Sequence, residues 1–160
     1  MSETTAEEES TVPPEVFYYH KNEAFDVLVE EEGLFTSNTK LYVFAGMVGF
    51  HLGRYTDEYD RNGEIRWSYI AGNNDLELPI AAIAYAHTQD PQVIDNQREQ
   101  VNILTGFAAS GANILVDEVI KQRGANLDNL LALINVDRDV DQRMKQSKML
   151  AEIDATLTQL

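Results

Sequence analysis

The sequence predicts a mainly α-helical fold, a compact single-domain helical bundle of about five to seven helices with a small β-hairpin near residues 58–70. Apolar residues recur at helical spacing along most of the chain, and Ser, Asn, Asp and Pro stand where helices would begin. One stretch, 64-EIRWSYI-70, alternates apolar and polar residues instead, as a half-buried strand does. A chain of 160 residues can bury roughly 68–70% of the surface that its unfolded form exposes, so a real core is expected.

The chain begins with a segment of low apolar content. Residues 1–14 are rich in Ser, Thr and Glu and end on Pro13-Pro14, which predicts a disordered acidic leader before one helical domain over residues 15–160. Between Phe17 and Leu34 apolar residues recur at helical spacing. This pattern predicts a first short helix that ends at Gly33.

The segment 40-KLYVFAGMVGFHLGRY-55 is apolar on every side of a predicted helix from about Thr39 to Leu52. Residues 36-TSNT-39 before it offer several helix caps, because their side-chain oxygens can accept the free N–H groups of a first turn. Glycine inside a helix costs about 0.5–1 kcal/mol relative to alanine. A glycine stripe is therefore expected where another backbone packs closely, or, alternatively, where a ligand approaches; its members are Gly46, Gly49 and Gly53.

Asn62-Gly63 fits the two loop residues of a type I′ hairpin, since both accept a positive φ. In that register Arg61 would face Glu64 across the turn, an opposite-charge pair. The hairpin near residues 58–70 is predicted on this basis.

The second half of the chain reads as further helices. Pro79 suits the first turn of a helix that continues through 80-IAAIAYAH-87, and Asp90-Pro91 is a cap followed by a first-turn proline. Residues 101–124 predict one long helix, or two helices broken near Gly111. Asn126 is expected to cap a short helix, and residues 139–160 form a separate amphipathic one.

The charge is the strongest signal in the composition, because 27 acidic residues face 12 basic ones and the net charge is -15. A surface of hydrated carboxylates keeps a protein soluble in molar salt, where self-repulsion is screened. The balance indicates a halophilic, archaeal-type protein; the alternative is an acidic mesophilic protein whose excess lies partly in residues 1–32. An acidic chain also argues against generic binding to nucleic acid.

Several classes of protein are disfavoured. The longest apolar run, Leu41 to Leu52, is shorter than the roughly 20 residues of a membrane-spanning helix, and the first residues resemble no secretion signal, so a cytoplasmic location and no membrane contact are expected. The absence of Cys excludes thiolate chemistry, and none of the common catalytic or phosphate-binding motifs occurs. Three widely spaced histidines and scattered carboxylates predict no metal site and no cofactor.

Two sets of residues are candidates for binding. Arginine beside stacking aromatic rings can hold a nucleic-acid strand, and the candidate DNA-binding residues are Lys40, Arg54, Arg61, Arg66 and Trp67. The alternative places Trp67 in the core and leaves the arginines to neutralise neighbouring acids. An exposed face of the last helix could instead dock a partner protein, and its candidate residues are Met144, Leu150, Ile153 and Leu157.

Four segments, taken in order, resemble a known family: 40-KLYVFAGMVGFHLGRY-55, 64-EIRW-67, 80-IAAIAYA-86 and 103-ILTGFAASGANIL-115. They are similar to the small Dnd-system-associated proteins found with DNA phosphorothioation genes, and the likeness covers about residues 36–120. The chain departs from that pattern at Phe107-Ala108-Ala109, where the family tends to show Tyr-Ala-Asn. The resemblance implies a place in a system that replaces a non-bridging oxygen of the DNA backbone by sulfur, with partner proteins that modify or restrict DNA.

Three hypotheses for function follow. The first is a non-catalytic accessory component of a phosphorothioation-linked restriction or antiviral defence system, which binds its other subunits or a second copy of itself. The second is a direct DNA-binding module or regulator of that system, which recognises phosphorothioated or ordinary DNA. The third is an enzyme, such as a nuclease accessory with an unrecognised carboxylate site.

Overall fold

The computed structural model describes residues 10–158, apart from the side chains of residues 136–146. Contacts between residues divide the chain into two compact units, one up to Val116 and one from Asp117 onward, and each is described by itself. The prediction that residues 15–160 form one domain stays a prediction.

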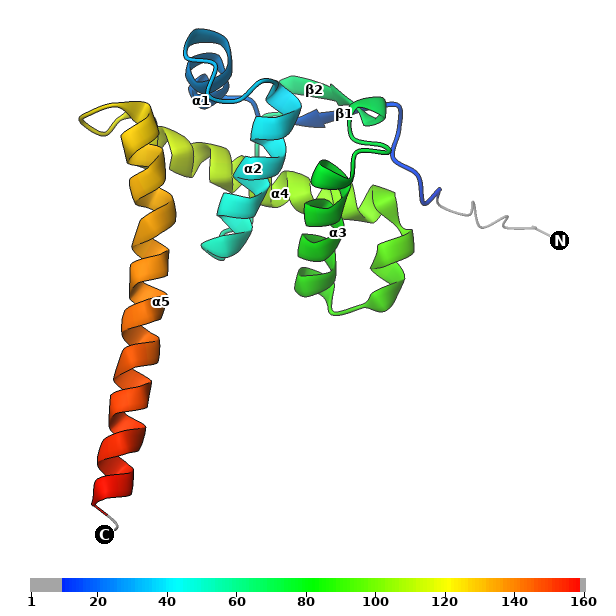
Figure 1. Ribbon diagram of the computed structural model, residues 1–160. Helices are drawn as coiled ribbons and strands as arrows, with labels where there is room; N and C mark the ends of the chain where they lie inside the picture. Colours follow the sequence, from blue (N-terminus) through cyan, green and yellow to red (C-terminus); the bar gives the residue numbers. More distant parts are fainter. Residues whose placement is uncertain (1–9, 159–160) are drawn as a thin grey trace, which may run out of the picture. The chain divides into compact units, whose positions relative to one another are not determined.

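The predicted mainly helical fold with a small antiparallel β element is confirmed. The first unit holds two strands and most of the helices (Figure 1). Its elements are β1 (Val16–Tyr19), α1 (Glu23–Phe25), the π-helical turn η1 (Asp26–Glu31), α2 (Asn38–His51), β2 (Gly63–Arg66), the 3₁₀ turn η2 (Trp67–Tyr69), α3 (Asn74–Thr88), the 3₁₀ turn η3 (Pro91–Asp95) and α4 (Gln97–Leu115).

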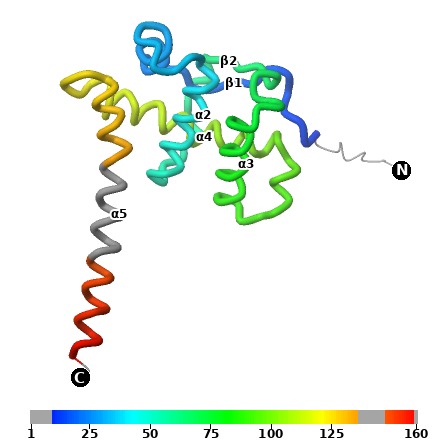
Figure 2. The backbone as a smooth tube through the Cα atoms, viewed as in Figure 1, coloured from blue at the N-terminus to red at the C-terminus, as the bar shows by residue number. Residues whose placement is uncertain are grey.

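The β element is not the local hairpin that the Asn62-Gly63 turn predicted. β2 pairs antiparallel with β1, so that Ile65 lies opposite Phe17 and Glu64 lies opposite Tyr18, not Arg61; the two strands run side by side in Figure 2. The Asn62 side chain forms two hydrogen bonds with the backbone of Lys21. It accepts one from the Lys21 N–H at 2.9 Å and donates one to the Lys21 carbonyl at 2.8 Å. These two bonds hold the start of β2 beside the end of β1, so Asn62 does not form the predicted hairpin turn.

Gly63 is needed for a different reason from the one predicted. Its φ is not positive. A Cβ at Gly63 would lie 2.6 Å from the ring of Tyr19, which is 1% exposed. The Tyr19 ring also packs against Phe25 and Tyr42, with ring centroids 5.1 and 5.5 Å apart. The sheet therefore joins the core through this aromatic group.

Helix α2 begins and ends within one residue of its predicted bounds. Ser37 caps it by accepting a hydrogen bond from the Lys40 N–H at 3.2 Å. Two members of the predicted glycine stripe pack closely against α4: a Cβ at Gly49 would overlap the carbonyl oxygen of Phe107, and one at Gly46 would overlap the side chain of Leu104. The contact is reciprocal, because a Cβ at Gly111 of α4 would overlap the carbonyl of Ala45. The prediction is wrong for Gly53, which follows the end of α2 with a φ of 66° and has nothing close to it.

Helix α4 is the longest helix of the first unit and its central element. It is continuous through Gly111 and leads into the π-helical turn η4 (Val116–Ile120). The segment Gln97–Ile120 is long and apolar enough to span a membrane by length and composition, but 72% of its most apolar window is buried, as in the core helix of a soluble protein. The alternative of two helices broken at Gly111 is wrong, because small residues there serve the contact with α2.

Two other helix boundaries differ from prediction. Helix α3 begins at Asn74, and Pro79 lies inside it, because the Asn73 side chain caps the earlier start by accepting from the Asp75 N–H at 3.2 Å. Strand β1 occupies residues that were assigned to the first helix, which begins only at Glu23. The spacing of apolar residues alone could not distinguish this four-residue strand from the helix that follows it.

The second unit consists mainly of one helix, α5 (Asn126–Leu157), and not of the two helices predicted. No Gly or Pro lies between the two predicted pieces, so nothing interrupts the backbone hydrogen bonds. Asn126 is the first residue of the helix rather than its cap. Asn129 instead holds the preceding turn, since its amide donates to the carbonyl of Val119 at 3.1 Å.

The Gly49 contact predicts the sign of a mutational effect. At an open helix face Gly49→Ala would raise stability, because alanine is the better helix former. We expect it instead to lower the free energy of unfolding by about 1–3 kcal/mol, through overlap with the Phe107 carbonyl. Chemical denaturation measures this, with Met47→Ala on the exposed side of α2 as a control that changes little. Stabilisation by Gly49→Ala would contradict the close packing.

Buried tyrosines predict a loss of stability at high pH. Burial, and secondarily the carboxylates of Asp26 and Glu30, raise the pKa of Tyr19 from 10.0 to about 12. The unfolded state therefore loses this proton first, and the stabilisation present below pH 10 is lost as the pH rises from 10 to 12. Between pH 10 and 12 we expect the free energy of unfolding to fall by about 2–3 kcal/mol less in Tyr19→Phe than in the unchanged protein, because the variant has no phenol to ionise. Identical pH profiles in urea denaturation would refute this.

Candidate functional site

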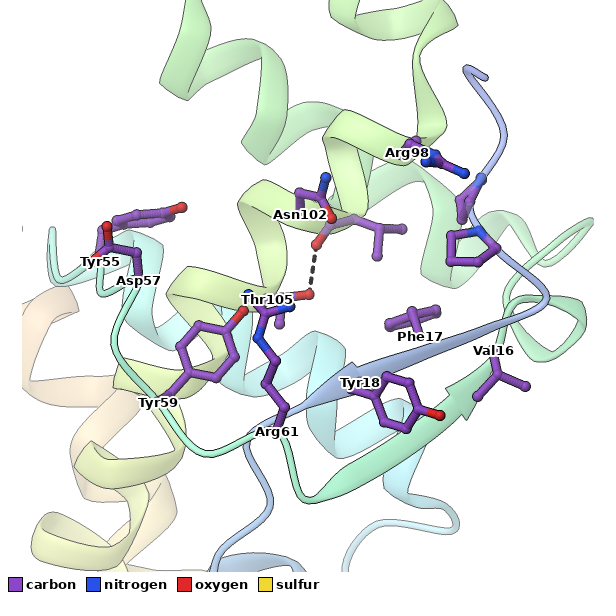
Figure 3. A pocket seen from close by; sticks show the side chains of 13 residues that line it. Val16, Phe17, Tyr18, Tyr55, Asp57, Tyr59, Arg61, Arg98, Asn102 and Thr105 are labelled. Carbon is purple, nitrogen blue, oxygen red and sulfur yellow. Dashed lines mark hydrogen bonds between the residues drawn. The ribbon is translucent and has the colours of Figure 1, made fainter. Parts of the chain in front are cut away.

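A pocket of about 440 Å³ in the first unit is lined by β1 with the residues before it, by the linker between α2 and β2, and by α4 (Figure 3). We call it the arginine–tyrosine pocket. The residues that give it its chemistry are Tyr18, Tyr55, Asp57, Tyr59, Arg61, Arg98 and Asn102. Pro13, Pro14, Val16, Phe17, Val101 and Thr105 complete the lining.

Strand β1 and helix α4 position the side chains on two sides of the pocket. In β1 the side chains alternate, so Phe17 and Tyr19 are buried while Tyr18 between them is 52% exposed. In α4 the pocket residues Arg98, Asn102 and Thr105 lie four and three residues apart, which puts them on one face of the helix. The Thr105 hydroxyl is occupied, because it donates to the Val101 carbonyl at 2.7 Å and bonds the Tyr42 hydroxyl at 2.8 Å.

The linker brings an arginine and two tyrosines to the third side. The Arg61 guanidinium lies over the ring of Tyr59, 5.3 Å from its centroid. Burial raises the pKa of Tyr59, while the nearby Arg61 charge opposes this shift. The phenol is therefore neutral at physiological pH and can donate a hydrogen bond, with a cation held against its ring.

Tyr55 is held in place by aromatic neighbours. Its ring stacks on His87, with centroids 5.6 Å apart and an angle of 18° between the planes, and it meets the edge of Phe107 at 5.1 Å. A Cβ at Gly106 would overlap the Tyr55 ring, so only glycine allows the linker to lie this close to α4. The Thr56 N–H also donates to the Gly106 carbonyl at 3.3 Å. These contacts fix the start of the linker on α4.

Arg98 connects the pocket to the N-terminal segment. Its backbone N–H donates to the Thr11 carbonyl at 2.9 Å, and its Nε donates to the Val12 carbonyl at 3.2 Å. Of the predicted disordered leader, residues 1–9 lie outside the described residues, and residues 10–14 are held here, with Pro13 buried. The leader therefore reaches the pocket at its last residues.

Helix α5 of the second unit presents a different kind of surface. Leu150, Ile153 and Leu157 are spaced three and four residues apart, on one side of the helix, and are 67%, 52% and 63% exposed. We call these three residues the α5 apolar face. Large apolar side chains grouped in this way on a helix are typical of a surface that binds another protein.

The sequence comparisons identify the family. A family model described as DNA sulphur modification system-associated protein 4 matches residues 20–153. The chain belongs to this Dnd-associated family. The match is longer than the segments that carried the resemblance and includes α2, α4 and most of α5. No curated protein and no solved structure matches the chain.

In this Dnd-associated protein the residues predicted to bind DNA do not form one site. Lys40 lies in the first turn of α2 and Arg54 follows its other end, so roughly 16 Å of helix axis separates them. Arg61 lines the arginine–tyrosine pocket, whereas Trp67 lines a second groove of about 450 Å³ with Leu78 and Ile94. Arg66 is exposed at the end of β2.

The docking residues predicted on the last helix fall on α5. Leu150, Ile153 and Leu157 form the α5 apolar face, while the side chain of Met144 lies outside the described residues. Sequence reasoning missed Arg98, Asn102 and Tyr18. A local signal was present only for Asn102, a polar residue within the apolar run 101-VNILTGF-107; none indicated Arg98, which lies in the polar first turn 97-QREQ-100, or Tyr18.

Within the described part of the chain, no group of three or more His, Asp or Glu side chains is placed to hold a metal ion. The groups that the pocket offers are guanidinium, phenol and amide donors with one carboxylate, Asp57. Such a set suits recognition of an anion with an attached planar group.

Proposed function

We propose that this protein is a non-catalytic accessory component of a DNA sulphur modification-linked restriction or antiviral defence system, which acts in the cytoplasm by binding other components of that system. Membership of a family named for its association with such a system supports this placement. The observation that carries the mode of action is the α5 apolar face. Sulfur transfer is left to the partners, because a chain without Cys has no thiolate to carry sulfur. No cofactor is proposed.

Burial of the α5 apolar face by a partner would be favourable. Each of its side chains is more than half exposed, and burying a Leu or Ile side chain contributes about 1.5–3 kcal/mol. Three of them on adjacent turns match the anchor spacing of a helix that lies in a groove. A partner groove could therefore bind this helix through a small number of contacts.

Charge indicates the kind of partner. Glu152 and Asp154 are exposed on either side of Ile153 in the sequence, and the whole chain carries a net charge of -15. A second copy would meet this charge with its own, and like charges across an interface are unfavourable unless salt screens them. We therefore propose an apolar groove with a basic rim on another component of the system, rather than a homo-oligomer.

Ile153→Glu tests the docking proposal. We expect affinity for the purified partner component to fall at least about tenfold, because a carboxylate would be buried in an apolar groove. Ala155→Glu is the matched control, since it adds the same charge to an exposed site about 200° around the same helix and should bind as the unchanged protein does. Each component of the system is titrated separately by calorimetry.

Two results would contradict the proposal. Equal affinity of Ile153→Glu and the unchanged protein would remove α5 from the interface. A dimer that light scattering detects in the isolated protein, and that Ile153→Glu dissociates, would instead make a second copy the occupant of this face.

Direct binding to DNA is the second candidate function, and the presence of two arginines with three tyrosines in one pocket favours it. If it holds, a phosphorothioated or unmodified DNA should bind with an affinity that falls at least about tenfold in Arg61→Ala. Fluorescence anisotropy in molar potassium chloride measures this, with Lys40→Ala as a control outside the pocket. Binding of neither DNA would exclude this candidate.

A further inference from the structure

We infer that the arginine–tyrosine pocket binds one nucleotide unit, with its phosphate on Arg61 and its base against a tyrosine ring. This inference rests on the second candidate function and goes beyond it by naming the chemical group that enters the pocket. It is independent of the α5 apolar face.

Arg61 is available for a phosphate, and Arg98 is a second arginine of the pocket without a carboxylate partner among the described residues. Among the described residues, Lys21 and Lys121 form salt bridges, and neither pocket arginine does, although acidic residues outnumber basic ones 27 to 12. Arg98 uses its Nε for the Val12 carbonyl, a bond that fixes the side chain and leaves its two terminal amino groups for a ligand. Arginine in this state suits phosphate, whose oxygens accept paired hydrogen bonds.

The pocket also contains tyrosine rings on which a base can stack. Tyr18 is 52% exposed and Tyr55 is 47% exposed; Tyr18 stands in strand β1, and the Tyr55 ring packs against His87 and Phe107. The Tyr59 ring carries the Arg61 guanidinium on its face. Figure 3 shows these side chains around the opening. Bases of any sequence stack on such rings, so recognition here requires no base-specific code.

The remaining polar groups fit the sugar and the base edge. The Asn102 amide lies one turn from Arg98 on the same face of α4 and makes none of the hydrogen bonds found among the described residues, so it can both donate and accept. Asp57 would repel a phosphate placed beside it, but its carboxylate can accept from a sugar hydroxyl or a base amino group. The charges thus orient the nucleotide, with its phosphate at the arginine side and its sugar or base beside Asp57.

The size of the pocket favours a nucleotide that is not in a duplex. A volume of about 440 Å³ lies in the range of small-molecule sites, roughly 300–1,000 Å³. Bases inside a duplex are stacked and paired, and entering a pocket would require extruding one of them. The ligand is therefore a free nucleoside phosphate or an unpaired nucleotide of a DNA strand.

The test compares a fluorescent single-stranded DNA of about twelve nucleotides, the duplex of the same sequence, and deoxyadenosine monophosphate as a competitor, all in molar potassium chloride. We expect the single strand to bind at least about tenfold more tightly than the duplex, and Arg61→Ala to reduce that affinity at least about tenfold. Arg66→Ala removes an exposed arginine outside the pocket and should change affinity by less than about twofold. Displacement by the mononucleotide indicates the free ligand, and its failure indicates the strand.

The outcomes separate the two proposals. Duplex binding equal to single-strand binding, or single-strand binding that Arg61→Ala leaves unchanged, overturns the inference while leaving a DNA-binding function. No binding of strand, duplex or mononucleotide overturns both. Matched unfolding curves for Arg61→Ala and the unchanged protein establish that the variant is folded, and Arg61→Lys, which keeps the charge without the planar fork, should retain part of the affinity.

Discussion

Close contact between the backbones of α2 and α4 is the constraint on which the first unit depends. Gly49 of α2 faces the Phe107 carbonyl, and Gly111 of α4 faces the carbonyl of Ala45, so each helix supplies a glycine where the other presents its main chain. Any side chain at either position would push the helices apart. This contact explains why two apolar helices tolerate glycines that lower their helix propensity, because the loss is offset by packing.

The arginine–tyrosine pocket follows from this packing. Once α2 lies on α4, the linker that leaves α2 must cross α4, and Gly106 lets the Tyr55 ring lie directly on the helix there. Farther along the linker, the bonds from Asn62 to Lys21 hold its end at the first strand. Arg61 is thereby brought to the face of α4 that carries Arg98. The pocket thus collects residues from three separate segments.

The two units provide different kinds of surface for a protein associated with DNA sulphur modification. The pocket carries polar side chains, and its arginines are a local positive feature in a strongly acidic chain. The α5 apolar face lies on a single helix and offers only side chains such as Ile153. A component that contacts both a partner protein and one nucleotide of a strand would use these surfaces independently, so each proposal can fail without the other.

The sequence by itself determined the helical class, the bounds of α2 to within one residue, and the family, because capping and apolar periodicity are local properties of consecutive residues. It also indicated Arg61 and the apolar residues of α5. The common site that it predicted for Arg61 and Trp67 does not form, because these residues line different hollows. Only the tertiary structure decided that β2 pairs with β1, that Asn62 binds the distant Lys21, and that Arg98 shares a pocket with Arg61. These are contacts between residues far apart in the chain, and they depend on which buried surfaces meet, which local spacing does not specify.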